Sequence, residues 1–191
     1  MITPLPILAM DDISTYHTMN LEETLGAKGK KPLFSDYSEN DYQVPIYLFW
    51  EYGCNHCDKL LDSLNENTNA YGKYFRLISF EISQDTNNKE LLNEMIDFLN
   101  LDSHGVPFMI IGDYAYQGYQ SSIEDDYLKN IITVYKQANR YDVISEMMED
   151  QNKKIRAEKM DQLKSVMIVA IIMMVFITLI IYKRRQRIRS L

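Results

Sequence analysis

Cys54 and Cys57 are the residues of this sequence best suited to chemistry. They are its two cysteines, and they stand three positions apart as Cys54-Asn55-His56-Cys57. A bond between them would close too short a loop to stabilise a fold, so we expect the pair to be kept for its reactivity. Thiolates exchange with disulfides through a mixed-disulfide intermediate. The spacing therefore predicts thiol–disulfide exchange.

The segments around the pair predict a strand that ends just before it and a helix that begins at it. Residues 45–50 are a short apolar and aromatic run between Pro45 and Gly53, typical of a buried strand. Residues 55–65 carry apolar side chains at helical spacing. Because the amino end of a helix stabilises an anion, we expect Cys54 to be the exposed nucleophile. Cys57, one turn further on, is expected to be more buried and to attack Cys54 to release the product.

The remaining periodicity predicts an α/β domain. A short helix is expected around residues 18–25, and the rest of 11–44 is expected to be loop. After the first helix of the site, the predicted elements are a strand (74–82), a helix (88–99), a strand (106–111), a hairpin strand (114–116) and a helix (124–138).

From about Pro45 to Ala138 the chain resembles the thioredoxin superfamily, in particular its small bacterial membrane-anchored members. Two segments carry the resemblance: Phe49 to Cys57 is similar to the family's active-site segment, and Gly105-Val106-Pro107 to its cis-proline loop. The resemblance implies a thioredoxin-like fold, a mixed central sheet flanked by helices. It also implies oxidoreductase activity without a cofactor, with Val106 and Pro107 binding an extended substrate segment. A trans proline that simply opens a strand is the alternative.

Two positions depart from the family pattern. Leu48 stands where thioredoxin has a buried aspartate, and Gly53 where it has a tryptophan. Loss of the acid puts efficient reduction in doubt. His56 lies inside the motif, where a histidine can stabilise the Cys54 thiolate and favour an oxidising or isomerising role. An ordinary surface residue is the alternative. The direction of exchange stays open, since the potential depends on local electrostatics.

A second functional feature is the uncharged, almost wholly aliphatic run Val166–Tyr182. As a helix these residues would be about 25 Å long, the short end of a bilayer span. Lys164 and Lys183 could reach the interface and close the shortfall. We expect a transmembrane helix; a buried helix of a soluble core is the alternative.

Charge predicts which side the domain occupies. Residues 183–189 hold five basic side chains and no acid, which favours a cytoplasmic C-terminus and a domain outside the membrane. An exported domain needs a leader, and residues 2–9 could be the remnant of a signal peptide or an ordinary N-terminus. A cytoplasmic domain on a tail anchor is the alternative topology.

The predicted organisation has five parts: an N-terminal segment (1–44), a thioredoxin-like domain (45–139), a charged helical stalk (140–165), the transmembrane helix (166–182) and a basic cytoplasmic tail (183–191). Residues 151–191 hold ten of the 20 Lys and Arg but only Glu158 and Asp161 of the 27 acidic residues. The remaining body is thus strongly acidic, which excludes nucleic acid as a partner.

The function predicted from the sequence is disulfide exchange at a membrane with cysteines of exported proteins. Its partners would be protein thiols or disulfides, a second redox protein and the lipid bilayer. A thioredoxin-fold adaptor with little turnover is the alternative. A zinc site is a lesser rival, because two cysteines with His17, His56 and His104 lack the spacing of a structural site. We therefore expect no metal.

Overall fold

The computed structural model of the chain describes residues 16–102, 105–138 and 142–189. The expected signal-peptide remnant at residues 2–9 and His104 lie outside the described residues. The chain forms two compact units, one ending at Met148 and the other beginning at Glu149.

The first unit is a mixed α/β domain. In chain order the elements are β1 (Thr18–Met19), α1 (Leu21–Ala27), β2 (Val44–Trp50), α2 (Asn55–Tyr71), β3 (Phe75–Glu81), α3 (Thr86–Phe98), β4 (Phe108–Ile111), β5 (Tyr114–Gln117), the 3-10 turn η2 (Ser121–Ile123), α4 (Glu124–Tyr135) and α5 (Val143–Arg189). Every strand and helix predicted from residue 45 to 138 is present. The helix α2 continues past the predicted stretch of residues 55–65 and ends at Tyr71. Apolar spacing could not predict its second half, because the buried positions there include the polar residues Asn65 and Thr68.

The strands form one five-stranded sheet in the order β1-β3-β2-β4-β5. The central strand β2 pairs in parallel with β3 and antiparallel with β4, while β1 and β5 pair antiparallel at the two edges. Because β2 lies between two neighbours, its carboxyl end is held from both sides. That end delivers the chain to the cysteine pair.

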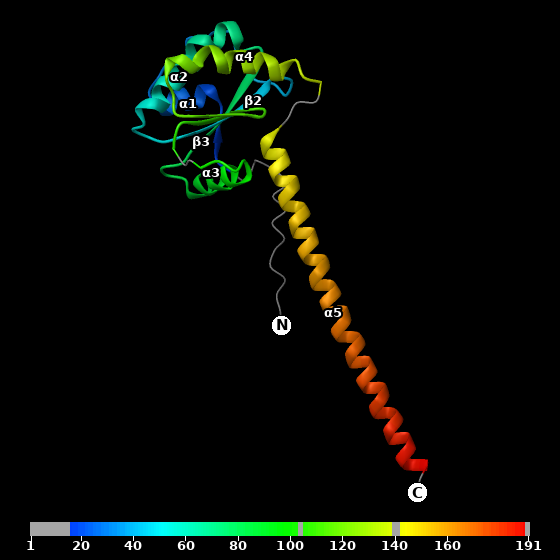
Figure 1. Cartoon of the computed structure of the whole chain (residues 1–191). Coiled ribbons are helices and arrows are strands. Elements are labelled where there is room, and N and C mark those ends of the chain that lie inside the picture. Colours follow the sequence, from blue (N-terminus) through cyan, green and yellow to red (C-terminus); the bar gives the residue numbers. More distant parts are fainter. Residues whose placement is uncertain (1–15, 103–104, 139–141, 190–191) are drawn as a thin grey trace. The chain divides into compact units, whose positions relative to one another are not determined.

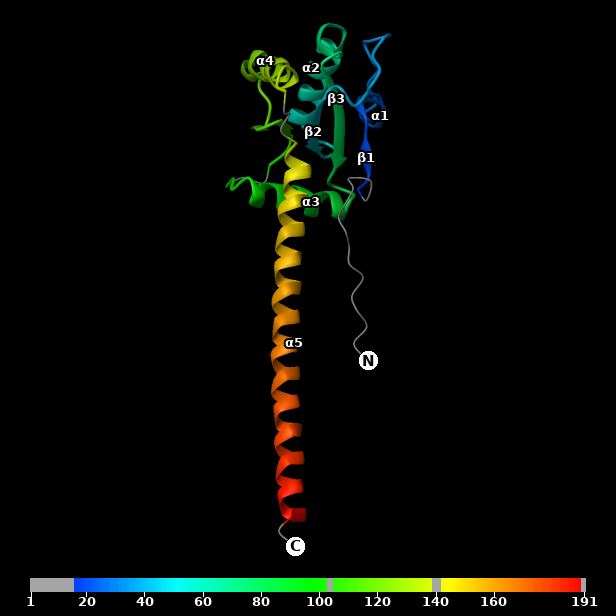
Figure 2. The ribbon, with the colours of Figure 1, turned by 90° about the vertical axis from the view of Figure 1, so that its right-hand side faces the viewer.

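Helices cover both faces of the sheet. Figure 1 shows α2 and α4 on one face and α3 on the other, and Figure 2 shows the same domain from the side. On the first face, Leu48 and Trp50 of β2 are buried in one core with side chains of α1, α2 and α4, among them Cys57 of α2. The second buries Phe49, Phe80 and Phe108 against α3. Successive residues of β2 thus point into opposite cores, as the alternation of a strand requires.

The N-terminal segment belongs to the fold more fully than the sequence predicted. Thr18 and Met19 form the edge strand β1 where a helix was expected, and α1 begins only at Leu21. A capping box fixes that start: the Asn20 side chain accepts from the Glu23 amide, and the Glu23 carboxylate accepts from the Asn20 amide. The helix is consequently anchored beside the sheet.

The first turns of α5 pack into the core of the domain. Val143, Ile144, Met147 and Met148 are buried in the same core as α3, where a solvated stalk was expected. Their spacing places them on one stripe of a helix, which a short pattern inside a charged segment did not reveal. These side chains therefore complete the domain.

From Glu149 onward α5 forms the second unit. None of the residues in its most apolar stretch of 18 is buried by protein, whereas the core helix of a soluble protein is mostly buried. Side chains from Val166 to Tyr182 are exposed all round the helix. It is the one helix among the described residues that is long and apolar enough to cross a membrane.

Candidate redox site

The cysteine pair lies at the junction between β2 and α2, as the sequence predicted. Cys54 and Cys57 are at disulfide distance, with their Cα atoms 5.3 Å apart. Cys54 is the N-cap of α2, and its Sγ accepts a hydrogen bond of 3.1 Å from the Cys57 amide. When the pair is reduced, the same amide and the amino end of α2 would stabilise a thiolate on Cys54.

The two cysteines differ in exposure. Cys57 is completely buried among core residues, whereas Cys54 is half-buried at the surface. The turn before them depends on Gly53, whose φ of +76° lies in the left-handed region that favours glycine. A residue with a side chain, such as the tryptophan that the resemblance implies at this position, would be strained here.

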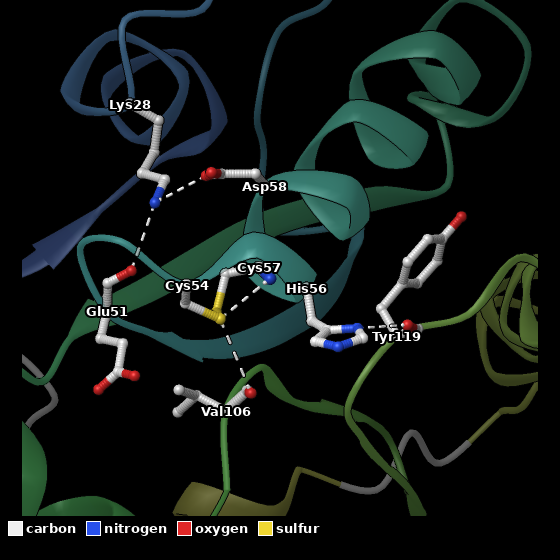
Figure 3. The surroundings of a disulfide bond; sticks show 8 residues. All are labelled: Lys28, Glu51, Cys54, His56, Cys57, Asp58, Val106 and Tyr119. Carbon is white, nitrogen blue, oxygen red and sulfur yellow. Dashed lines mark hydrogen bonds and ion pairs between the residues drawn. A yellow bond between two sulfur atoms is a disulfide. The ribbon is translucent and has the colours of Figure 1, made fainter.

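The loop before β4 approaches Cys54 from the other side of the site. The Val106–Pro107 peptide bond is cis, so the alternative of a trans proline is wrong. The Val106 carbonyl oxygen lies 3.8 Å from Cys54 Sγ, and Figure 3 shows it directed at the sulfur. The Gly118 amide donates to the Pro107 carbonyl oxygen at 2.8 Å and holds this loop against the end of β5. The backbone of Val106 is thus within reach of whatever binds Cys54.

His56 is exposed and its ring is tied to the neighbouring loop. Nδ1 lies 2.9 Å from the Tyr119 carbonyl oxygen (Figure 3). Since a carbonyl can only accept, Nδ1 carries the proton in this contact, and Nε2 is then the acceptor of the neutral ring. The modulating role suggested for His56 stays a prediction, while its visible contact links α2 to the segment before α4.

Hollows open on both sides of the pair. One, of about 450 Å³, is lined by His56, Tyr119 and Glu124 among other residues. Another, of about 550 Å³, is lined by Val106 together with Glu51 and Lys89. Each hollow is thus lined by a residue next to the pair, His56 inside the motif and Val106 across from Cys54.

Glu124 organises the first of these hollows. Its carboxylate accepts hydrogen bonds from the Ser63 hydroxyl, the Tyr119 hydroxyl at 2.8 Å and the Asn67 side chain at 3.1 Å. The bond from Ser63, followed by those from Tyr119 and Asn67, lowers the pKa of Glu124, and partial burial opposes the shift. Burial raises the pKa of Tyr119. Near neutral pH this rim thus pairs a carboxylate with a neutral phenol.

Leu48, the second departure from the family pattern, is a fully buried core residue. Its partner across the sheet in β3 is Ser79. The Ser79 hydroxyl accepts from the Trp50 indole at 3.2 Å and lies 2.6 Å from the Thr24 hydroxyl of α1. At the position where the resemblance implies a buried carboxylate, this chain has an apolar side chain next to a small hydroxyl network.

Two residues that the sequence analysis passed over contact this site from α1, Thr24 and Lys28. Thr24 joins the hydroxyl network, and Lys28 reaches the turn between β2 and α2. The capping box at Asn20 and Glu23 is the sequence signal that could have placed this helix. The polar sequence of residues 11–44 contains no other pattern that predicts a contact between this helix and the segment around Cys54 and Cys57.

The other histidine of the described residues, His17, is exposed, and its carbonyl oxygen accepts from Asn88. Across residues 16–102, 105–138 and 142–182, side chains of His, Cys, Asp and Glu do not gather in any group of three or more able to hold a metal ion.

No protein-family model matches this chain, and no curated protein matches it significantly. The case for its function rests on the geometry of the cysteine pair.

Proposed function

We propose that this chain is a membrane-anchored thiol–disulfide oxidoreductase of the thioredoxin-like class. One observation carries the proposal. A half-buried sulfur, Cys54 Sγ, caps the amino end of a helix and faces the Val106 carbonyl, while its partner Cys57 is buried behind it. This arrangement exposes one sulfur to attack and keeps the second as an internal leaving group.

The fold supports the thioredoxin-like assignment. The element order implied by the resemblance is present from β2 to α4, around a mixed sheet flanked by helices. The cis Val106–Pro107 bond lies beside the pair, where the resemblance implies a segment that binds substrate. Val106 and Pro107 are accordingly proposed to hold an extended substrate strand against Cys54.

The proposed exchange conserves atoms and electrons. A substrate thiolate attacks Cys54 Sγ, the Cys54–Cys57 bond breaks, and Cys57 leaves as a thiolate that takes up a proton. A second substrate thiolate then attacks the substrate sulfur of the mixed disulfide and releases Cys54. The substrate gains a disulfide, two electrons pass to the protein, and a second disulfide-bearing redox protein restores the pair. Run in reverse, the same steps reduce a substrate disulfide.

The sequence of the second unit supports a proposal about where the substrates lie. The basic run at residues 183–189 favours a cytoplasmic C-terminus, and α5 could span the bilayer. We therefore propose that the domain faces outward and acts on cysteines of exported proteins. A membrane-impermeant thiol reagent, applied to intact cells after mild reduction, should label Cys54; labelling only after cell lysis would place the domain inside.

Trapping tests the activity itself. Cys57→Ser in the full chain should accumulate mixed disulfides through Cys54, seen as larger species on a non-reducing gel and lost on reduction. Cys54→Ser is the matched control, since it keeps a cysteine in the motif but removes the exposed sulfur, and it should abolish exchange with a reduced peptide dithiol. Full exchange by Cys54→Ser would refute the role of Cys54, whereas no trapped species with Cys57→Ser and no exchange by the wild type would indicate the adaptor.

The equilibrium of the Cys54–Cys57 disulfide with glutathione gives its reduction potential. That potential shows whether the protein oxidises or reduces its substrates. A potential of around −120 to −180 mV is that of donors of disulfides or isomerases, and one near about −270 mV is that of a reductant.

A further inference from the structure

Lys28, the C-cap residue of α1, makes the most extensive contacts with the segment that carries the cysteines. Its side chain is only 5% exposed, and its Nζ lies 2.7 Å from Asp58 Oδ1. The same Nζ donates to the Glu51 carbonyl oxygen at 3.3 Å. It also lies 5.3 Å from the centre of the Trp50 ring and 5.9 Å from that of Tyr52.

These contacts fall on both sides of the cysteine motif. Trp50, Glu51 and Tyr52 precede Cys54, whereas Asp58 directly follows Cys57. Figure 3 shows the ammonium group between the Glu51 carbonyl and the Asp58 carboxylate. One cation therefore joins the turn after β2 to the first turn of α2, the two segments that fix where Cys54 Sγ lies.

The ammonium group is nearly withdrawn from water, so its interactions must replace hydration. The Asp58 carboxylate supplies charge at close range, although the angles of this ion pair fall outside those of a hydrogen bond. The Glu51 carbonyl and the two aromatic faces supply the rest. Asp58 itself is tied to the site, because its amide donates to the Cys54 carbonyl oxygen at 3.1 Å.

Lys30 provides a natural comparison two residues further on. It forms an ion pair of 2.6 Å with Asp62, one helical turn beyond Asp58 on α2. This pair joins the same two parts of the domain, but its carboxylate lies a turn further from the motif. Lys30 therefore shares the structural role of Lys28 without its contacts to the segment before Cys54.

We propose that Lys28 is a positioning residue of the dithiol site, holding the turn from Trp50 to Tyr52 against the start of α2 and balancing the charge of Asp58. The inference builds on the proposed function, since it assigns Lys28 to the same cysteine pair. Without Lys28, the Asp58 carboxylate would be left unbalanced beside the helix end that stabilises the Cys54 thiolate. Less thiolate would form at a given pH, and the reduced state would lose stability relative to the disulfide.

The test uses the full chain in nanodiscs and compares Lys28→Met, Lys28→Arg and Lys30→Met. The first readout is the rate at which Cys54 of the reduced protein reacts with iodoacetamide between pH 5 and 9. For Lys28→Met we expect the rate at pH 7 to fall about threefold, which corresponds to about half a pKa unit of the thiol. The dithiol–disulfide equilibrium with glutathione should move toward the disulfide, and Lys28→Arg should recover most of both changes.

The matched control separates positioning from general stability. Lys30→Met should lower the melting temperature but leave both the alkylation profile and the glutathione equilibrium at their wild-type positions. If Lys28→Met behaves like Lys30→Met in both readouts, the proposal is overturned. Should Lys28→Met fail to fold, Asp58→Asn takes its place: it removes the opposing charge and keeps the shape, so alkylation should become faster. An unchanged alkylation profile in Asp58→Asn would equally refute the role.

These readouts need no protein substrate, which separates this proposal from the proposed function. A chain that never traps a substrate could still show the Lys28 effect, and a chain that traps substrates could lack it.

Discussion

The first turns of α5 and its stretch from Val166 to Tyr182 are both rich in apolar residues, yet they meet different surroundings. At its start, Val143, Ile144, Met147 and Met148 pack into the second core of the domain. Beyond Val166 the apolar side chains point outward all round the helix and touch no core. The difference lies in the pattern: a single stripe at the start fits one protein surface, whereas a helix that is apolar on every side fits lipid.

One continuous helix thus has two parts with different surroundings. Its first turns are a structural part of the α/β domain, and its later turns are long and apolar enough for a bilayer.

The largest effect is expected from truncation. A chain ending at Met148 should fold, whereas one ending at Ala138 should not. Each of the four lost side chains contributes about 1.5–3 kcal/mol of burial. Their joint loss rivals the whole free energy of unfolding of a typical domain, about 5–15 kcal/mol. Circular dichroism during heating shows whether each chain unfolds cooperatively. Equal melting curves for the two chains would contradict the assignment of residues 143–148 to the core.

Two methionines of α5, one buried and one exposed, allow the two surroundings to be compared by single substitutions. Met147 is 1% exposed and Met160 is 54% exposed. Met147→Ala should lower the free energy of unfolding by about 2–5 kcal/mol, because it removes a buried side chain and leaves a cavity. Met160→Ala removes the same atoms from an exposed position and should change the free energy of unfolding by less than about 0.5 kcal/mol. Urea unfolding of chains ending at Ser165 measures both.

A charge placed in the apolar stretch of α5 tests whether this stretch spans a membrane. Ile172→Arg should reduce the fraction of the chain recovered in membranes, since an arginine at the centre of a span costs about 3 kcal/mol on insertion scales. The control is Gln162→Arg, which adds the same charge before the apolar run. Carbonate extraction of membranes followed by immunoblotting measures the retained fraction, and equal retention of the two variants would argue against a span.

The smallest effect concerns the contact that ties β2 to the start of α5. The Tyr47 hydroxyl donates to Asp142 at 2.8 Å, and Tyr47→Phe should cost about 1 kcal/mol of stability near neutral pH. Burial, followed by the Asp142 charge and its hydrogen bond, raises the pKa of Tyr47 above its usual 10.

The pH dependence of that variant has a definite sign. Because the pKa of Tyr47 is raised in the folded chain, its contribution is complete below pH 10 and is lost as pH rises above that value. The stability gap between wild type and Tyr47→Phe should therefore narrow above pH 10. A gap that widens with alkali would show that the phenol ionises more readily in the folded state.

Local patterns predicted much of this domain because its strands and helices from residue 45 carry regular apolar spacing. The position of Cys54 at the start of a helix followed from the same patterns. The contacts of Thr24 and Lys28 could not be predicted, since they join segments more than twenty residues apart in sequence through polar groups. The role of Val143 to Met148 was hidden for a related reason: four apolar residues in a charged helix have no fixed partner until the sheet is built.

The complete burial of Cys57 also bears on how the protein withstands strong oxidants. Peroxide can reach Cys54, but it cannot reach a sulfur with no exposed surface. A sulfenic acid formed on Cys54 would meet the Cys57 thiol at once and condense to the disulfide before a second oxygen could be added. Oxidative damage would thus end in the ordinary oxidised form of the pair, which thiol exchange can reverse.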